Sequence, residues 1–348
     1  MKHPILLSGF AAVTLILSAC GGGGNNSSVT SSPTTPGTPG TVVSQMAMDV
    51  TVDSPAMDTL TNAATTAINA TVFIPEHVEG ASYPLIIHSH GFGGSRVSEA
   101  DAIASGPDPQ ARSSTTSVFT RIDNQVRLLW DAGYAVISFD ERGFGTNDDS
   151  ETEPSGGTAR IIDPMFEVVD AIAVMNWAVE NLDISMADGD PLVGTIGGSY
   201  GGGYQLLLAA LDDDASLGAL AHVDAITPTA TWYDLRQSLT PNRVIKKGFV
   251  SGLSAAGTAD MAVLDPIVQR GIAQGSANPA SRFREDIDDD VTQFFFDHGL
   301  AAFEADTSFT PQPVDALLTQ GQRDFLFNAR ESANNYRFLN SVGNSDVR

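Results

Sequence analysis

The chain has 348 residues, 42% of them hydrophobic, which is enough for one large core or two modest ones. Acidic residues number 42 and basic residues 18, so the formal net charge is −24. Such a surface repels nucleic-acid phosphate, and nucleic acid is therefore not expected as a partner. The single cysteine, Cys20, excludes an intrachain disulfide and a multi-cysteine metal site.

The first twenty residues have the layout of a secretory signal. Lys2 and His3 precede an apolar run over 5–17, which is too short to span a bilayer comfortably. Leu17-Ser18-Ala19-Cys20 is similar to the lipobox of bacterial lipoproteins, which implies an exported chain anchored to a bacterial membrane by lipid on Cys20. An ordinary signal peptide with a chance cysteine is the alternative. Residues 21–45, rich in Gly, Ser, Thr and Pro, are predicted to be a flexible linker to a domain over 46–348.

Strands alternate with helices along this domain. Apolar runs bounded by turn residues predict strands over 46–52, 67–74, 85–88, 134–139, 193–196, 219–226 and 314–319. Helices are predicted over 121–132, 204–211 and 328–339, and another from Asp163 as N-cap with Pro164 at its first position. The alternation predicts an α/β fold, with a mostly parallel sheet covered by helices on both faces.

The helix after Asp163 has one apolar face. Val168, Ile172 and Met175 follow helical spacing, and Glu167 and Asp170 fall off that face, so both acids are predicted to face solvent. The acidic runs 212–214 and 288–290 are likewise interpreted as solvated surface. Between about 232 and 311 the alternation stops, which indicates a helical lid insertion over the strand ends, with Trp232 and Tyr233 as candidate pocket residues.

The sequence Gly197-Gly198-Ser199-Tyr200-Gly201 lies between a predicted strand and a predicted helix. This is G-x-S-x-G in the context that a nucleophile elbow requires, a sharp turn that displays the serine hydroxyl. Glycine is needed where strand and helix approach closely, and the free N–H of Tyr200 at the helix start can donate to an oxyanion. Neither G-x-G-x-x-G nor the P-loop pattern fits residues 194–206, which argues against a nucleotide site.

A second glycine-rich turn, Ser89-His90-Gly91-Phe92-Gly93-Gly94, follows the buried strand 85–88. In hydrolases the loop after this strand provides the second oxyanion donor, and the backbone N–H of Phe92 is assigned that role. A plain glycine-rich loop is the alternative.

Four segments together resemble α/β-hydrolases of the X-prolyl dipeptidyl-peptidase and cocaine-esterase group: HGFGG, LLWDAGYAVISFDERGFG, GTIGGSYGGGYQ and LTQGQRDFLFN. The resemblance covers about 83–339. It implies a serine nucleophile, matched by Ser199, an acid matched by Asp324, a histidine near the C-terminus and a further β-sandwich domain.

Histidine is where the sequence departs from this family. The six histidines are at positions 3, 77, 88, 90, 222 and 298, and none follows Asp324. A serine without an imidazole lacks its general base. The expectation is a C-terminally truncated chain, with His298 in the lid insertion as a weaker candidate base and His222 as a weaker one still.

The sequence thus predicts a serine hydrolase that cleaves ester or amide bonds of a small molecule or peptide through an acyl-enzyme, without metal or organic cofactor. X-prolyl peptides are the substrates that the resemblance implies. The alternative is a catalytically inactive pseudo-hydrolase or gene fragment that acts as a surface binding protein.

Overall fold

The computed structural model describes residues 40–105, 124–145, 155–246, 248–250, 252–253, 255, 263–276, 288–306, 311–343 and 346–348. The folded unit runs from Thr41 to Arg348. Cys20 and most of the predicted linker lie outside the described residues, so export and lipidation stay predictions. Strand β1 (Val42–Val43) pairs with β4 (His77–Val78), and the folded unit therefore begins a few residues before the predicted Met46. No helix in the described ranges has the length and apolar character needed to cross a membrane.

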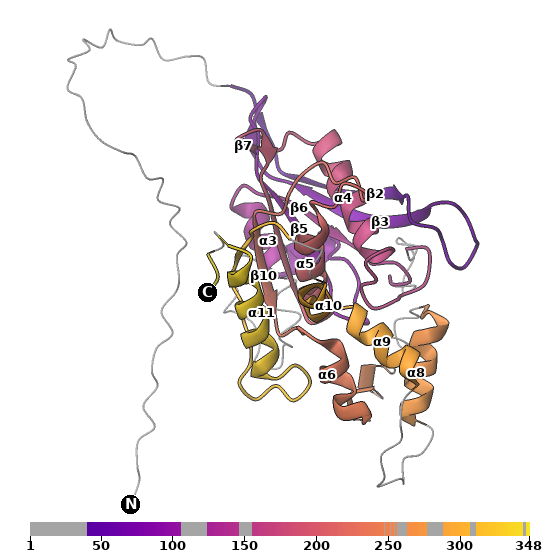
Figure 1. Cartoon of the computed structure of the whole chain (residues 1–348). Coiled ribbons are helices and arrows are strands. Elements are labelled where there is room, and N and C mark those ends of the chain that lie inside the picture. Colours follow the sequence, from indigo (N-terminus) through magenta and orange to yellow (C-terminus); the bar gives the residue numbers. More distant parts are fainter. Residues whose placement is uncertain are drawn as a thin grey trace, which may run out of the picture. The chain divides into compact units, whose positions relative to one another are not determined.

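The central sheet has seven strands within the described residues, in the order β11-β10-β9-β5-β6-β3-β2 (Figure 1). The pairs β2·β3 and β3·β6 are antiparallel, and the remaining pairs are parallel. The strand bounds are Met46–Ser54 (β2), Thr66–Ile74 (β3), Leu85–Ser89 (β5), Ala135–Phe139 (β6), Val193–Gly198 (β9), Ala225–Thr229 (β10) and Asp315–Ala316 (β11). A separate hairpin joins β7 (Met186–Ala187) to β8 (Asp190–Pro191).

Successive side chains along a strand point to opposite faces of the sheet, so the strands contribute to two hydrophobic cores, one on each face. Leu85 and Ile87 of β5 belong to one core, and Ile86 between them packs on the other. The first core lies under α4 (Glu167–Asn181) and α5 (Tyr200–Leu211), and the second under α3 (Gln125–Asp131). The mostly parallel sheet with helices on both faces confirms the predicted α/β architecture.

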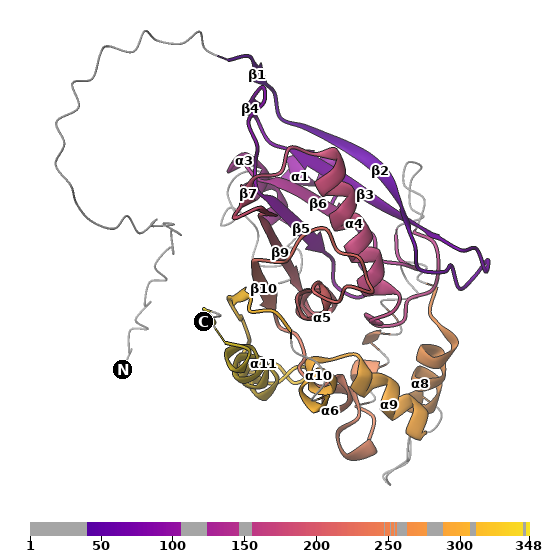
Figure 2. The same ribbon diagram turned by 45° about the horizontal axis from the view of Figure 1, so that its top comes forward.

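The helices of the predicted lid insertion lie together beyond one end of the sheet, as Figures 1 and 2 show from two directions. They are α6 (Leu235–Leu239), the 3-10 turn η1 (Pro241–Arg243), α8 (Pro266–Ser276), α9 (Asp289–Asp297) and α10 (Leu300–Ala305). The other described helices are α1 (Glu99–Ser105) and the C-terminal α11 (Ala329–Ser341).

Several predicted boundaries are wrong: the strand expected over 314–319 is only Asp315–Ala316, and the helix expected from Tyr204 begins at Tyr200. Two further differences have a clear local cause. The helix expected from Asp163 begins at Glu167 with Phe166 as N-cap. Asp163 instead begins a separate turn, in which its carbonyl oxygen accepts the Phe166 N–H. The strand expected over 219–226 begins only at Ala225. Leu220 and Val223 donate their N–H groups to Asn176 and Asp212, so side chains rather than a neighbouring strand satisfy that backbone.

The strand order places a topological switch point between β5 and β9. The chain leaves β5 toward β6 on one side and leaves β9 toward β10 on the other, and the carboxyl ends of these parallel strands bound the crevice where such folds bind ligands. The loop that follows β5 contains Phe92, and the turn that follows β9 contains Ser199. The fold therefore brings the two glycine-rich turns of the sequence to the same edge.

Candidate active site

Ser199 occupies the turn between β9 and α5 with φ 56° and ψ −111°. This is a strained conformation for a residue with a side chain, and such strain concentrates at functional sites. The backbone around it is fully engaged: Ser199 N–H donates to Thr229 O at 2.8 Å, and Ser199 O accepts from Gly202, Gly203 and the Thr231 hydroxyl. The hydroxyl of Ser199, by contrast, has no hydrogen bond with any described residue and faces a pocket.

The glycines on either side of Ser199 are required by close approach to β5. A Cβ at Gly201 would lie 2.1 Å from the carbonyl oxygen of Ser89, and one at Gly197 would lie 2.6 Å from the same atom. Contacts this short are impossible for a real side chain. The predicted reason for glycine at these two positions is confirmed.

Tyr200 and Phe92 meet beside Ser199. Their rings pack edge to face with centroids 5.4 Å apart, and both residues line the pocket. Tyr200 is the first residue of α5, so its N–H has no acceptor one turn earlier in the helix and is available to an oxyanion. The loop before Phe92 is fixed by His90, whose Nε2 accepts the Glu141 N–H and whose Nδ1 donates to Gly91 O.

The pocket beside Ser199 encloses about 640 Å³, open solvent at its mouth included. Its walls come from the elbow and from the helices beyond the sheet: α6 contributes Leu235 and Leu239, α8 Val268, Gly271 and Ile272, and α9 Phe295. Trp232 also lines the pocket, as the sequence predicted, and its indole N–H donates to His298 O. Tyr233 is not one of the lining residues.

Asp324 follows β11 at the same edge of the sheet as Ser199. Backbone hydrogen bonds connect the segments that follow β9, β10 and β11 at this edge. Ser199 N–H donates to Thr229 O, and Ala230 N–H donates to Thr319 O. One carboxylate oxygen of Asp324 accepts the N–H groups of Leu326 and Phe327, and the other accepts from Gln320 at 3.2 Å. Phe327 lines the pocket, so Asp324 lies directly behind part of its wall.

The two histidines that the sequence analysis considered as substitute bases pair with other acids. His298 is buried, its Nε2 lies 3.6 Å from Asp163, and its Nδ1 has no hydrogen-bond partner among the described residues. His222 is half exposed, with Asp212 and Asp213 at 3.8 and 3.9 Å, and it lies before β10 rather than inside the predicted strand. Asp212 itself is buried, which corrects its interpretation as solvated surface.

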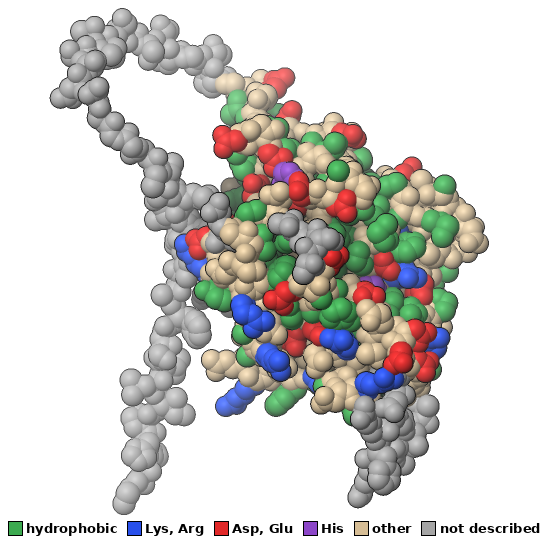
Figure 3. All heavy atoms as spheres, in the orientation of Figure 1, with side chains coloured by type: hydrophobic (Ala, Val, Ile, Leu, Met, Phe, Trp, Pro, Cys, Tyr) green, Lys and Arg blue, Asp and Glu red, His purple; other side chains and the backbone are tan. Residues whose placement is uncertain are grey.

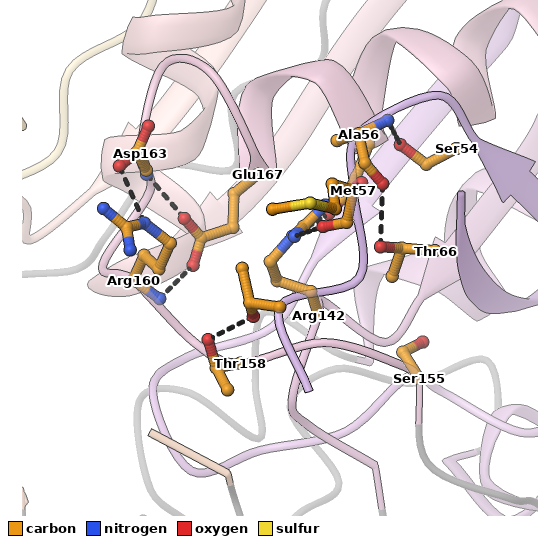
Figure 4. A network of polar contacts seen from close by, with 12 residues as sticks. Ser54, Ala56, Met57, Thr66, Arg142, Ser155, Thr158, Arg160, Asp163 and Glu167 are labelled. Atoms are coloured by element: carbon orange, nitrogen blue, oxygen red, sulfur yellow. Dashed lines mark hydrogen bonds and ion pairs between the residues drawn. The ribbon is translucent and has the colours of Figure 1, made fainter. Parts of the chain in front are cut away.

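A buried acid network that the sequence did not predict joins Glu167 to the segment from Arg160 to Asp163 (Figure 4). Glu167 is 1% exposed, and its carboxylate accepts the N–H groups of Arg160 and Asp163, each at 2.6 Å, and the Tyr200 hydroxyl at 3.0 Å. Ile161, between those two donors, has a positive φ of 62° and lines the pocket. Glu167 thus connects the pocket wall to the residue that follows Ser199.

Burial and local donors push the pKa values in this network in opposite directions. Burial raises the pKa of Glu167 to about 7, although the two backbone N–H donors oppose the rise. Burial also acts to raise the pKa of Asp163, but hydrogen bonds from His298, Met165 and Arg160 outweigh it and lower that pKa to about 2. Nearby, Asp170 forms a buried two-pronged ion pair with Arg142. The prediction that Glu167 and Asp170 face solvent is wrong, because the Arg142 and Arg160 segments cover this side of α4.

Known proteins resemble this chain in sequence. The sequence model of one protein family, X-Pro dipeptidyl-peptidase (S15 family), matches residues 64–345. An uncharacterized 31.7 kDa protein in the traX-finO intergenic region of Escherichia coli is 32% identical over 130 residues, which are 37% of this chain and 34% of that protein. The match therefore spans about a third of that relative's length.

Two solved structures resemble this chain at low sequence identity. Acetyl xylan esterase from Paenibacillus sp. R4 is 16% identical with a TM-score of 0.48, over 88% of this chain and 77% of the esterase. Candida antarctica lipase A is 15% identical with a TM-score of 0.52, over 89% of this chain and 76% of the lipase. The likeness to the lipase confirms the predicted α/β-hydrolase fold.

Proposed function

The chain belongs to the X-Pro dipeptidyl-peptidase family (S15), and on that premise we propose that it is a serine hydrolase that cleaves ester or amide bonds through Ser199. The observation that carries the proposal is the elbow: a strained serine between β9 and α5, with its hydroxyl in a pocket and unbound by the described residues. A turn that only connected a strand to a helix would not need this strain.

In the proposed reaction, Ser199 Oγ attacks the carbonyl carbon of the substrate. The negative charge that develops on the carbonyl oxygen is stabilised by the N–H groups of Tyr200 and Phe92. The leaving alcohol or amine departs with a proton, and the acyl group stays on Ser199 until a water molecule attacks it and regenerates the hydroxyl.

The proton of Ser199 needs a base. Asp324, at the edge of the sheet beside the pocket, is proposed to orient an imidazole, as the resemblance implies. Among the described residues, His298 is the candidate base, because its Nδ1 is buried and has no hydrogen-bond partner. The carbonyl oxygen of His298 accepts the indole N–H of Trp232, which lines the pocket.

A serine-reactive fluorophosphonate probe tests the nucleophile. We expect the folded protein to be labelled and Ser199→Ala to lose essentially all of the labelling, because removing a nucleophilic serine lowers the rate by a factor on the order of 10⁶. Ser238→Ala is the matched control, because Ser238 is a buried hydroxyl of α6 outside the pocket lining, and its labelling should be unchanged. Labelling that persists in Ser199→Ala would contradict the proposal.

The second candidate is a non-catalytic binding protein, favoured by the absence of a hydrogen-bonded base on Ser199 Oγ among the described residues. Imidazole added to the buffer separates the two. A hydrolase limited by a missing base gains labelling rate with imidazole concentration, and the gain disappears in Ser199→Ala. A folded protein that is not labelled with or without imidazole supports the non-catalytic candidate.

A further inference from the structure

On the premise that the proposed function is right, the polarity of the pocket indicates which chemical groups the substrate has. We infer that Ser199 acts on a neutral ester with an extended apolar group, rather than on a peptide with a free amino terminus.

The described lining residues include no charged side chain. Their polar side-chain groups are the hydroxyls of Ser199, Tyr200 and Thr240 and the indole N–H of Trp232, and three of these are already engaged. The Tyr200 hydroxyl donates to Glu167, the Thr240 hydroxyl donates to Arg236 O at 2.8 Å, and the indole N–H donates to His298 O. Ser199 Oγ is therefore the single polar side-chain group of the described lining that is open to a ligand.

An ammonium group would lose its hydration in such a pocket and gain no carboxylate from the described lining residues in return, which is strongly unfavourable. Glu167, which is hydrogen-bonded to the hydroxyl of the lining residue Tyr200, is already used by that hydroxyl and by two backbone N–H groups behind the wall. An alkyl or aryl group meets the opposite situation, because every apolar surface that it buries gains free energy.

The apolar walls of the pocket extend from the elbow onto three helices of the lid insertion. The walls that an extended group reaches are on α6, α8 and α9, away from the elbow, so its length is sensed by Leu239, Ile272 and Phe295.

Hydrolysis of p-nitrophenyl acetate, butyrate and octanoate tests the inference. We expect kcat/KM to rise by about three- to fourfold for each methylene that enters the pocket, which is the gain from burying that surface. Glycyl-prolyl-p-nitroanilide, with its free amino group, should be a poorer substrate than octanoyl-p-nitroanilide, which has the same scissile bond and leaving group. A profile that is flat or falls with chain length, or a preference for the dipeptide, overturns the inference.

Two substitutions on α8 make the test specific. Ile272 lines the pocket and Ile267 does not, although both are partly buried hydrophobic residues of the same helix. Ile272→Asp should lower kcat/KM for the octanoate at least tenfold and change that for the acetate little. Ile267→Asp should leave the ratio of the two esters unchanged. An equal effect of both substitutions on that ratio would contradict the assignment of the wall.

Binding to Ser199→Ala separates this inference from the proposed function. Nile red, a neutral apolar fluorophore, should bind this variant and be displaced by methyl octanoate but not by glycyl-proline. Adding Ile272→Asp should weaken the binding of Nile red and of methyl octanoate. If this pattern appears and the wild-type protein is never labelled by fluorophosphonate, the pocket is apolar and the hydrolase proposal fails. If labelling succeeds and the octanoate neither binds nor reacts preferentially, the substrate inference fails alone.

Discussion

Single residues show how far burial departs from what spacing along a helix predicts. Glu167 and Asp170 lie off the apolar face of α4, yet both are 1% exposed. Their carboxylates are covered by segments from elsewhere in the chain, which supply Arg142 to Asp170 and two backbone N–H groups to Glu167. A helical pattern reports only the residue types on each face, so it cannot show that polar partners cover the second face.

Glu167→Gln tests the cost of this burial. The pKa of Glu167 is raised from 4.5 to about 7, so between these pH values the native state binds more protons than the unfolded state, and stability falls as pH rises. The full loss is on the order of 3 kcal/mol. Glutamine cannot ionise, and we expect the variant to lose less stability than wild type across this window in urea unfolding.

Glu180→Gln is the control, because Glu180 is an exposed residue of the same helix. Other buried acids with raised pKa values that do not interact with Glu167, such as Asp212, titrate in all three proteins and cancel in the difference. A pH dependence in Glu167→Gln identical to that of wild type would show that Glu167 does not ionise in this window.

At the scale of elements, strong local signals gave the right structure and weak ones did not. The strand, turn and helix around Ser199 form as the sequence predicted, because glycine at 197 and 201 permits an approach that no other residue allows. The segment 219–224 is apolar enough to resemble a strand. It is a loop because Asn176 and Asp212 satisfy its backbone, and those side chains come from other elements.

Gly201→Ala tests the packing of the elbow. Alanine favours a helix by about 1 kcal/mol over glycine, but its Cβ would overlap the Ser89 carbonyl. We expect the clash to win, with the free energy of unfolding lowered by about 1–3 kcal/mol. Gly248→Ala is the matched control, since nothing lies within 4 Å of its added Cβ, and it should be neutral or slightly stabilising. A stable Gly201→Ala protein would mean that β5 and α5 are not in contact here.

For the whole molecule, net charge is the dominant electrostatic fact. On the face drawn in Figure 3 most of the lysine and arginine side chains lie in the lower half, and acidic side chains occur across the whole face. Several cations are already matched, for example Arg243 with Asp289 and Arg270 with Asp290. A charge of −24 therefore leaves many acids that repel one another in the compact state.

Sodium chloride should accordingly stabilise this protein. Screening at about 0.15 M shortens the Debye length to roughly 8 Å and weakens repulsion between separated acids. We expect the thermal midpoint of unfolding to rise by a few degrees between low and physiological ionic strength, equivalent to roughly 1 kcal/mol. An equal osmolality of sucrose is the comparison that controls for general solvent exclusion. A midpoint that falls with salt would mean that favourable ion pairs outweigh the repulsion.

The sequence by itself determined the α/β architecture, the elbow at Ser199, the second glycine-rich turn at Phe92 and an acid after the following strand at Asp324. These features are local, because each depends on glycine, on alternation or on the order of short motifs. Only the tertiary structure decided that Glu167 supports Tyr200 and Ile161, that His298 pairs with Asp163, and that the pocket beside Ser199 is apolar. Each of these depends on which side chains meet across long separations in the chain, and no spacing along the sequence encodes such meetings.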